Sequence, residues 1–435
     1  MGITSSQQSS TPSAITKSGS ESKEGEQMSQ KIFLEDLPYD MRSHILSMLD
    51  LPSLKALVYA SPTFHKQYLS ARRYHLCRSL EETLGSAVVD AYAVHALMIR
   101  KYYSRKKLIN LLGSYAERTA RRHDRLPHKM RQSDAVIMAS FYLRSVRLIV
   151  PSYARWALED LAKNAGSPPL VDCQQPDSLT GTETARVTRA AYRFHLLCQL
   201  TGPQSSIIGI SKRSVIDRLL ISIEPWEVEE LFSVYQFAHG VYSEIVDDIR
   251  LDVNPANPKF DNDGHTSTPV GAFDLGNPGR STNLDDLVDD RESFIEGATL
   301  QGLPLLNKVL FKVLDHTQLV SVMQQHMTPS YIRFNSPLGP LGSAKQFQRT
   351  ARYPTERDRM HAEHAPFPFR GDNDPDAPPL AWTILWSNRY CNLYGKFINN
   401  EIRRWGYIFW DAARLERSGG RKVLERQWWE RMERR

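Results

Sequence analysis

Cysteine is scarce in this chain of 435 residues, and the four cysteines lie far apart. Cys77, Cys173, Cys198 and Cys391 form no Cys-x-x-Cys pair. This spacing argues against a zinc ribbon, a thioredoxin-like redox site and a disulfide-stapled secreted domain. Because the sequence also shows no secretory leader, we expect reduced thiols in an intracellular protein, either cytoplasmic or nuclear.

Signatures of catalysis and of cofactor binding are absent as well. There is no Walker loop, GxGxxG, GxSxG or HExxH motif. His361 and His364 are three residues apart, but no third ligand with suitable spacing lies near them. We therefore predict no metal, no cofactor and no enzymatic activity, and an enzyme without a readable signature remains the third possibility.

Long uninterrupted apolar runs are missing too. The best candidate, AVIMASFYLRSVRLIV, is interrupted by Arg144 and Arg147 and predicts a buried amphipathic helix rather than a transmembrane segment. The first residues, MGITSS, match an N-myristoylation pattern at Gly2 and Ser6. A chance match in a serine-rich tail is the preferred interpretation, because no polybasic patch accompanies it.

Alternating strand patterns are rare, whereas apolar residues at helical spacing recur along most of the chain. We predict a mainly α fold, in which an N-terminal three-helix module precedes a large irregular helical domain. The expected organisation is a disordered tail at 1–30, the module at 31–75, a helical domain at 76–250, a disordered or long acidic loop at 251–292, and a helical C-terminal part at 293–435 with a proline-rich loop at 328–379. The aromatics Trp382, Trp386, Tyr390, Trp405, Tyr407, Phe409 and Trp410 are expected in the core.

Charge is unevenly distributed, although the net charge is only +6. Residues 100–131 hold eleven Lys or Arg and two acids, and residues 247–296 hold twelve acids and four bases. The basic run predicts either a solvated helix face, which the acidic region would help to neutralise, or an anion-binding surface. Candidate anion-binding residues are Arg105, Lys106, Lys107, Arg121, Arg122 and Arg125. A helical nucleic-acid-binding or scaffold protein is thus the alternative function, with nucleic acid the less favoured partner.

The stretch LPYDMRSHILSMLDLPSLKALVYASPTFHK, residues 37–66, opens the ordered part of the sequence. Pro38 is suited to a first helical turn, Ser53 can cap a second helix, and Ser61-Pro62 repeats the signal for a third. The apolar positions at helical spacing are more than so short a segment can bury within itself. We expect the exposed part of this apolar surface to dock onto another protein.

This stretch resembles an F-box. Leu37-Pro38 begins the family's pattern, Asp40 supplies its acid, Ala60-Ser61 stand at its small pair, and Phe64 takes its aromatic place. Ala60 and Phe64 depart from the family's usual cysteine and tryptophan. LKALVYASPTFHKQYL and WGYIFWDAARLE are also similar to stretches of filamentous-fungal F-box-like proteins of unassigned substrate.

The resemblance implies a substrate-receptor subunit of a Skp1-cullin-F-box type ubiquitin ligase. The partners would be a Skp1-type adaptor, a cullin reached through it, and an unknown protein substrate. The implied adaptor-binding residues are Leu37, Pro38, Met41, Ile45, Leu46, Leu49, Leu51, Leu54, Leu57 and Phe64. The remainder of the chain would recognise the substrate.

Overall fold

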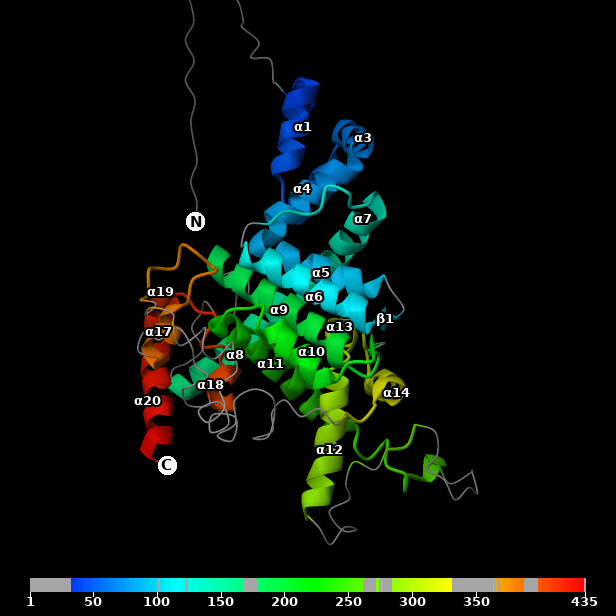
Figure 1. Ribbon diagram of the computed structural model, residues 1–435. Coiled ribbons are helices and arrows are strands. Elements are labelled where there is room, and N and C mark those ends of the chain that lie inside the picture. The colour runs from blue at the N-terminus through cyan, green and yellow to red at the C-terminus, as the bar shows by residue number, and fades with distance from the viewer. Residues whose placement is uncertain are drawn as a thin grey trace, which may run out of the picture.

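The computed structural model is mainly α-helical, as the sequence predicts. It describes residues 33–99, 102–121, 124–166, 179–205, 207–260, 271–273, 275, 284–330, 363, 365, 368–386 and 398–433. Strand structure in this part of the chain is limited to β1 (Tyr103–Ser104) and β2 (Ile207–Ile208), which pair in parallel. Figure 1 shows the helices gathered around a central pair, with one group projecting at the N-terminal end.

The projecting group begins with a 3-10 turn at Leu34–Asp36 and contains α1 (Tyr39–Met48), α2 (Leu51–Ala60) and α3 (Pro62–Ser70). We call residues 33–70 the N-terminal module. Asp50, rather than the predicted Ser53, caps α2, because the helix begins at Leu51 and the Asp50 carboxylate accepts from the Ser53 amide at 2.8 Å. Ser61 caps α3 as predicted.

The module continues into α4 (Arg72–Leu84), which contacts α1 and α2 on one side and α7 (Gln132–Phe141) on another. The predicted boundary at residue 75 therefore falls inside a helix. In Figure 1 the same helix leads from the module down to α5 (Val88–Met98) and α6 (Arg105–Ala120). The module is thus fixed to the body through α4.

A single helix of 34 residues, Gln132–Ala165, follows α6. It consists of α7, a π-helical turn at Tyr142–Val146 and α8 (Arg147–Ala165). By length and composition it is the one helix in the described ranges that could cross a membrane, a test that core helices of folded domains also pass. Ile149, Tyr153 and Ala157 on α8 are fully buried.

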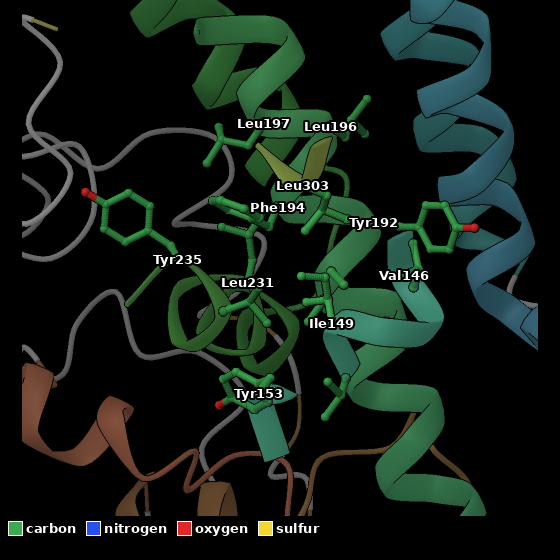
Figure 2. Packing of buried hydrophobic residues seen from close by; sticks show 14 of the residues in the cluster. Val146, Ile149, Tyr153, Tyr192, Phe194, Leu196, Leu197, Leu231, Tyr235 and Leu303 are labelled. Atoms are coloured by element: carbon green, nitrogen blue, oxygen red, sulfur yellow. The ribbon is translucent and has the colours of Figure 1, made fainter. Parts of the chain in front are cut away.

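The centre of the fold is α9 (Gly181–Thr201) packed against α11 (Pro225–Ile249), with α5, α8 and α10 (Lys212–Leu220) around them. Figure 2 shows how side chains from three helices meet: Ile149 and Tyr153 from α8, Phe194 from α9, and Leu231 from α11. Most positions of α9 are buried on every side of the helix. Helix α9 is therefore a core helix.

Buried arginines tie α9 to its neighbours. Arg186 pairs with Asp411 at 2.8 Å, and Arg193 contacts Asp90 at 2.9 Å and Glu227 at 2.7 Å. Arg189 binds both carboxylate oxygens of Glu230 and also pairs with Asp376. Because an unpaired charge is very unfavourable in a protein interior, these contacts fix α5, α11 and the C-terminal segments around α9.

Two further buried pairs extend this network to the C-terminal part. Glu183 at the start of α9 accepts two hydrogen bonds from Arg414, at 2.7 and 2.8 Å. Glu229 on α11 accepts two from Arg403, at 2.8 and 2.9 Å. Each pair joins helices that are far apart in the sequence, so the network connects the central helices α9 and α11 to the C-terminal part.

In its described residues, the C-terminal part contains α12 (Leu284–Thr299), α13 (Leu303–Phe311), α14 (His316–His326), α17 (Leu380–Trp386), α18 (Asn400–Arg404), α19 (Ala412–Arg417) and α20 (Gly420–Glu433). The expected aromatic core is confirmed at Trp382, Trp386, Trp405, Tyr407, Phe409 and Trp410, which are all buried. Tyr390 lies outside the described residues.

The prediction of a disordered or long acidic loop at 251–292 is wrong at both ends of that range. Helix α12 begins at Leu284, and Val253 and Leu275 are buried in the core cluster. Leu284, Leu287 and Val288 have helical spacing, which explains why the aspartates between them belong to a helix. Asp376, near the end of the expected proline-rich loop, is also buried, and it pairs there with Arg189.

Described acids of the acidic region pair with nearby bases rather than with the basic run. Asp247 pairs with Arg291 at 2.7 Å, and the imidazole of His316 lies 3.1 Å from Asp248 and 2.9 Å from Asp252. In the described ranges no acid of 247–296 pairs with a base of 100–131. Among the described residues, the two regions therefore do not pair with each other, as the sequence suggested they would.

Candidate docking face of the N-terminal module

Helix α1 exposes an apolar stripe. Pro38, Met41, Ile45 and Met48 are spaced by three, four and three residues, which places them on one side of the helix. Met41 is 54% and Met48 61% exposed, Pro38 is exposed, and Ile45 is half-buried. We call these four residues the α1 stripe. A surface helix usually presents polar side chains here, so this stripe is suited to cover by a partner.

The ten residues implied by the resemblance separate into three groups. Pro38 and Met41 are exposed, and Leu37, Ile45, Leu49 and Leu57 are half-buried. Leu46, Leu51, Leu54 and Phe64 are buried and pack in the core of the module. The first two groups offer surface on the outside of the module, whereas the last group holds α1, α2 and α3 together, with Leu51 and Leu54 also lining a groove on the body side.

Met48 was missed, although a signal for it exists in the sequence. The resemblance implied Met41, Ile45 and Leu49 as contacts, whereas the exposed stripe ends at Met48. Leu49 follows the end of α1 and is half-buried. The heptad-like spacing 38–41–45–48 identifies Met48 once Leu46 is assigned to the opposite, buried side.

Arg42 holds the beginning of the stripe in place. Its guanidinium donates to the backbone carbonyls of Glu35 and Leu37, at 2.6 and 2.7 Å, and to Oε1 of Gln67 at 2.9 Å. Gln67 on α3 in turn donates to the carbonyl of Tyr39 at 2.7 Å. This clamp connects the Leu37-Pro38 segment to α3 and orders it before any partner binds.

A groove opens between the module and the body. Its volume is about 520 Å³, and its walls come from α2, α3, α4, α7 and the π turn. Leu54, Val58 and Leu76 form part of its apolar lining, and Tyr59 and Leu69 are exposed beside it. Lys55, Arg72 and Arg144 also line it, and none of the described lining residues carries a carboxylate. The groove therefore suits an apolar segment with acidic neighbours.

The basic run does not form one patch. Arg105, Lys106 and Lys107 begin α6, whereas Arg121 and Arg125 lie beyond its end, and all five are exposed. A helix of this length separates its ends by about 24 Å. Arg118, near the end of α6, pairs with Asp124 at 2.6 Å. Arg122 lies outside the described residues.

The described ranges contain no group of three or more His, Cys, Asp or Glu side chains that could hold a metal ion. His361 and His364 lie outside these ranges, as do Gly2, Cys173 and Cys391. Cys77 and Cys198 are free thiols.

Comparisons with protein-family models, with curated proteins and with solved structures found no match to this chain. The resemblance to an F-box therefore rests on the residues between Leu37 and Phe64 and on the two short stretches named with them.

Proposed function

We propose that the chain is a substrate-receptor subunit of a cullin-type ubiquitin ligase and docks onto a Skp1-type adaptor through residues 33–70. The observation that carries the proposal is the exposed α1 stripe, at the projecting end of the molecule. The order of motifs from Leu37 to Phe64 supports the same partner. The helical body would then serve as the recognition domain for an unknown protein.

The energetics of the stripe favour docking. Fully burying a side chain of the size of Met contributes roughly 1.5–3 kcal/mol. Met41, Met48 and their neighbours Phe33, Leu34 and Tyr39 are all more than half exposed. A partner that covers several of them gains enough free energy for a specific complex, because a few anchors usually dominate an interface. The clamp by Arg42 lowers the ordering cost of the Leu37-Pro38 segment.

The groove supports a second contact with the same partner. An apolar helix of the adaptor could insert between Val58 and Leu76, with acidic residues placed near Lys55 and Arg72. Opposite charges at the rim of such an interface mainly raise the association rate and select the partner. We therefore expect adaptor binding to weaken moderately with salt.

Affinity purification of the full chain, tagged at the C-terminus, tests this function. We expect adaptor and cullin peptides from the wild-type chain, and their loss when Leu37→Ala and Pro38→Ala are combined. Truncation of central anchors costs about 2 kcal/mol or more each, which is roughly 30-fold in affinity. Circular dichroism must show that the double variant keeps its helical content. Undiminished recovery of adaptor by a folded double variant rejects the docking role.

The alternative is nucleic-acid binding through the exposed bases at the two ends of α6. Because these groups are separated, they would contact phosphates at two places and show no preference for sequence. Binding should then fall steeply between 50 and 200 mM salt. Nuclease-sensitive partners in the same purification would favour this alternative.

A further inference from the structure

A second cavity lies in the body, between the end of α9 and the turn that joins α12 to α13. Its volume is about 540 Å³, within the range of small-molecule sites. Leu97, Tyr103, Leu300 and Leu305 supply much of its apolar lining, from α5, β1, the turn and α13. These elements are distant in sequence, so the cavity forms only in the complete fold.

The polar groups of the cavity carry no negative charge. His195, Gln199, Gln301, Lys308 and His326 line it, and none of its described lining residues is an Asp or a Glu. Lys308 is half-buried and makes no ion pair with any described residue. Lys308 is the one permanent charge among the described lining residues. Burial lowers the pKa of the His326 imidazole, and the nearby charge of Lys308 lowers it further.

The wall beside α9 is tightly built. Gly302 has φ of +75°, and a Cβ there would lie 2.5 Å from Nδ1 of His195. A Cβ at Gly202 would lie 2.3 Å from the carbonyl oxygen of Leu300. Both positions therefore require glycine, and the α12–α13 turn packs directly on α9. The cavity is preformed rather than opened by its ligand.

The cavity is unsuited to nucleophilic catalysis. Burial raises the pKa of the Cys198 thiol well above its usual value, and the thiol lies 3.6 Å from the carbonyl oxygen of Thr299. Burial also lowers the pKa of His195 to about 3, so the imidazole is neutral at pH 7. A protonated thiol beside a neutral imidazole gives no thiolate. The negative charge of Glu296 also raises the pKa of the Cys198 thiol, but Glu296 is not among the described residues that line the cavity.

We propose that this cavity binds a small amphipathic carboxylate, whose charged group lies at Lys308 and His326 and whose apolar body lies along Leu97, Tyr103 and Leu305. One permanent positive charge matches a monoanion better than a phosphate monoester, which carries nearly two negative charges at pH 7. The apolar lining and the absence of carboxylates from it exclude cationic ligands. This site is independent of the docking face.

Calorimetric titration of the full-length wild-type chain with octanoate, octan-1-ol and octyl phosphate tests the proposal. We expect octanoate to bind more tightly than either of the others. Lys308→Met should weaken octanoate about tenfold or more and leave octan-1-ol unchanged, because a charge-assisted hydrogen bond is lost. Lys312→Met is the matched control, since this exposed lysine is four residues away and does not line the cavity.

A second variant tests the apolar half of the site. Leu97→Trp places a larger side chain at the half-buried end of α5 and should weaken octanoate and octan-1-ol together. The melting temperature of each variant shows whether it is folded. The proposal would be overturned by equal affinity of the wild type for octanoate and octan-1-ol, or by wild-type affinity of Lys308→Met for octanoate. It would also be overturned if octanoate gave no heat of binding at millimolar concentration.

Discussion

Nε of Arg42 lies 2.9 Å from Oε1 of Gln67, a contact that connects α1 with α3 across 25 residues of chain. The same guanidinium holds the carbonyls of Glu35 and Leu37, so one side chain orders the segment that leads into the α1 stripe. Neither residue belongs to the set that the resemblance implied. Their role is to position the docking face.

Arg42→Met should weaken adaptor binding without removing the helices. Three hydrogen bonds are lost, and since two of the acceptors are part-exposed carbonyls that water can reach, the free energy of unfolding should fall by only about 1–3 kcal/mol. Gln67→Met should have a similar effect, and the double variant should cost less than the sum of the two. Urea unfolding and adaptor titration measure both quantities.

Arg78→Met is the control for this prediction. Arg78 lies on α4 and pairs with Glu81 at 2.8 Å, in a half-exposed i,i+3 contact. Such pairs contribute about 0–1 kcal/mol, so adaptor affinity and stability should stay close to wild type. Equal losses from Arg42→Met and Arg78→Met would show that the clamp has no special role.

Arg189→Met tests the buried network. The substitution leaves Glu230 and Asp376 without their shared guanidinium in the core, and breaking a buried ion pair from one side typically costs about 3–5 kcal/mol. Arg421→Met removes exposed pairs with Glu416 and Glu425 and should cost less than about 1 kcal/mol. Denaturant unfolding of the two variants compares these costs. Similar small losses would mean that the buried pairs do not hold the fold.

Acid should destabilise the protein through His195. Its pKa falls from the ordinary value of 6.5 to about 3 in the fold because the ring is buried, so below pH 6.5 the unfolded chain binds a proton that the folded chain does not. Stability from this group is therefore complete above pH 6.5 and declines toward pH 3, by about 2 kcal/mol at pH 5. Unfolding free energies at pH 7 and pH 5 measure the slope.

His195→Gln should flatten this dependence on pH. Some slope should remain, because burial also lowers the pKa of His75. If His195→Gln kept the wild-type slope, the imidazole would not be the group that titrates on unfolding.

Local patterns predicted much of the module. Pro38 and Ser61 mark helix starts because their signals act within one turn, and the structure begins α1 and α3 there. The cap of α2 is Asp50 and not the predicted Ser53. Both residue types can cap a helix, and the exact start of α2 decides between them. Helical spacing also identified the aromatic core.

The buried network could not be predicted in the same way. Arg186, Arg189 and Arg193 have the spacing of a solvated helix face, and the partner Asp376 is 187 residues beyond Arg189. No local signal distinguishes such arginines from surface ones, because only tertiary packing supplies their carboxylates. The start of α12, by contrast, was open to prediction from Leu284, Leu287 and Val288.

The most direct test of the docking face is the affinity of the purified chain for a purified Skp1-type adaptor. Met41→Glu combined with Met48→Glu places two charges on the α1 stripe at positions that solvent already reaches. Leu314→Glu is the matched control, because Leu314 is 85% exposed and lies outside the module. We predict that the wild type and the control bind equally, and that the stripe variant binds at least about 30-fold more weakly. Equal binding by all three proteins, or no binding by the wild type, would contradict the account.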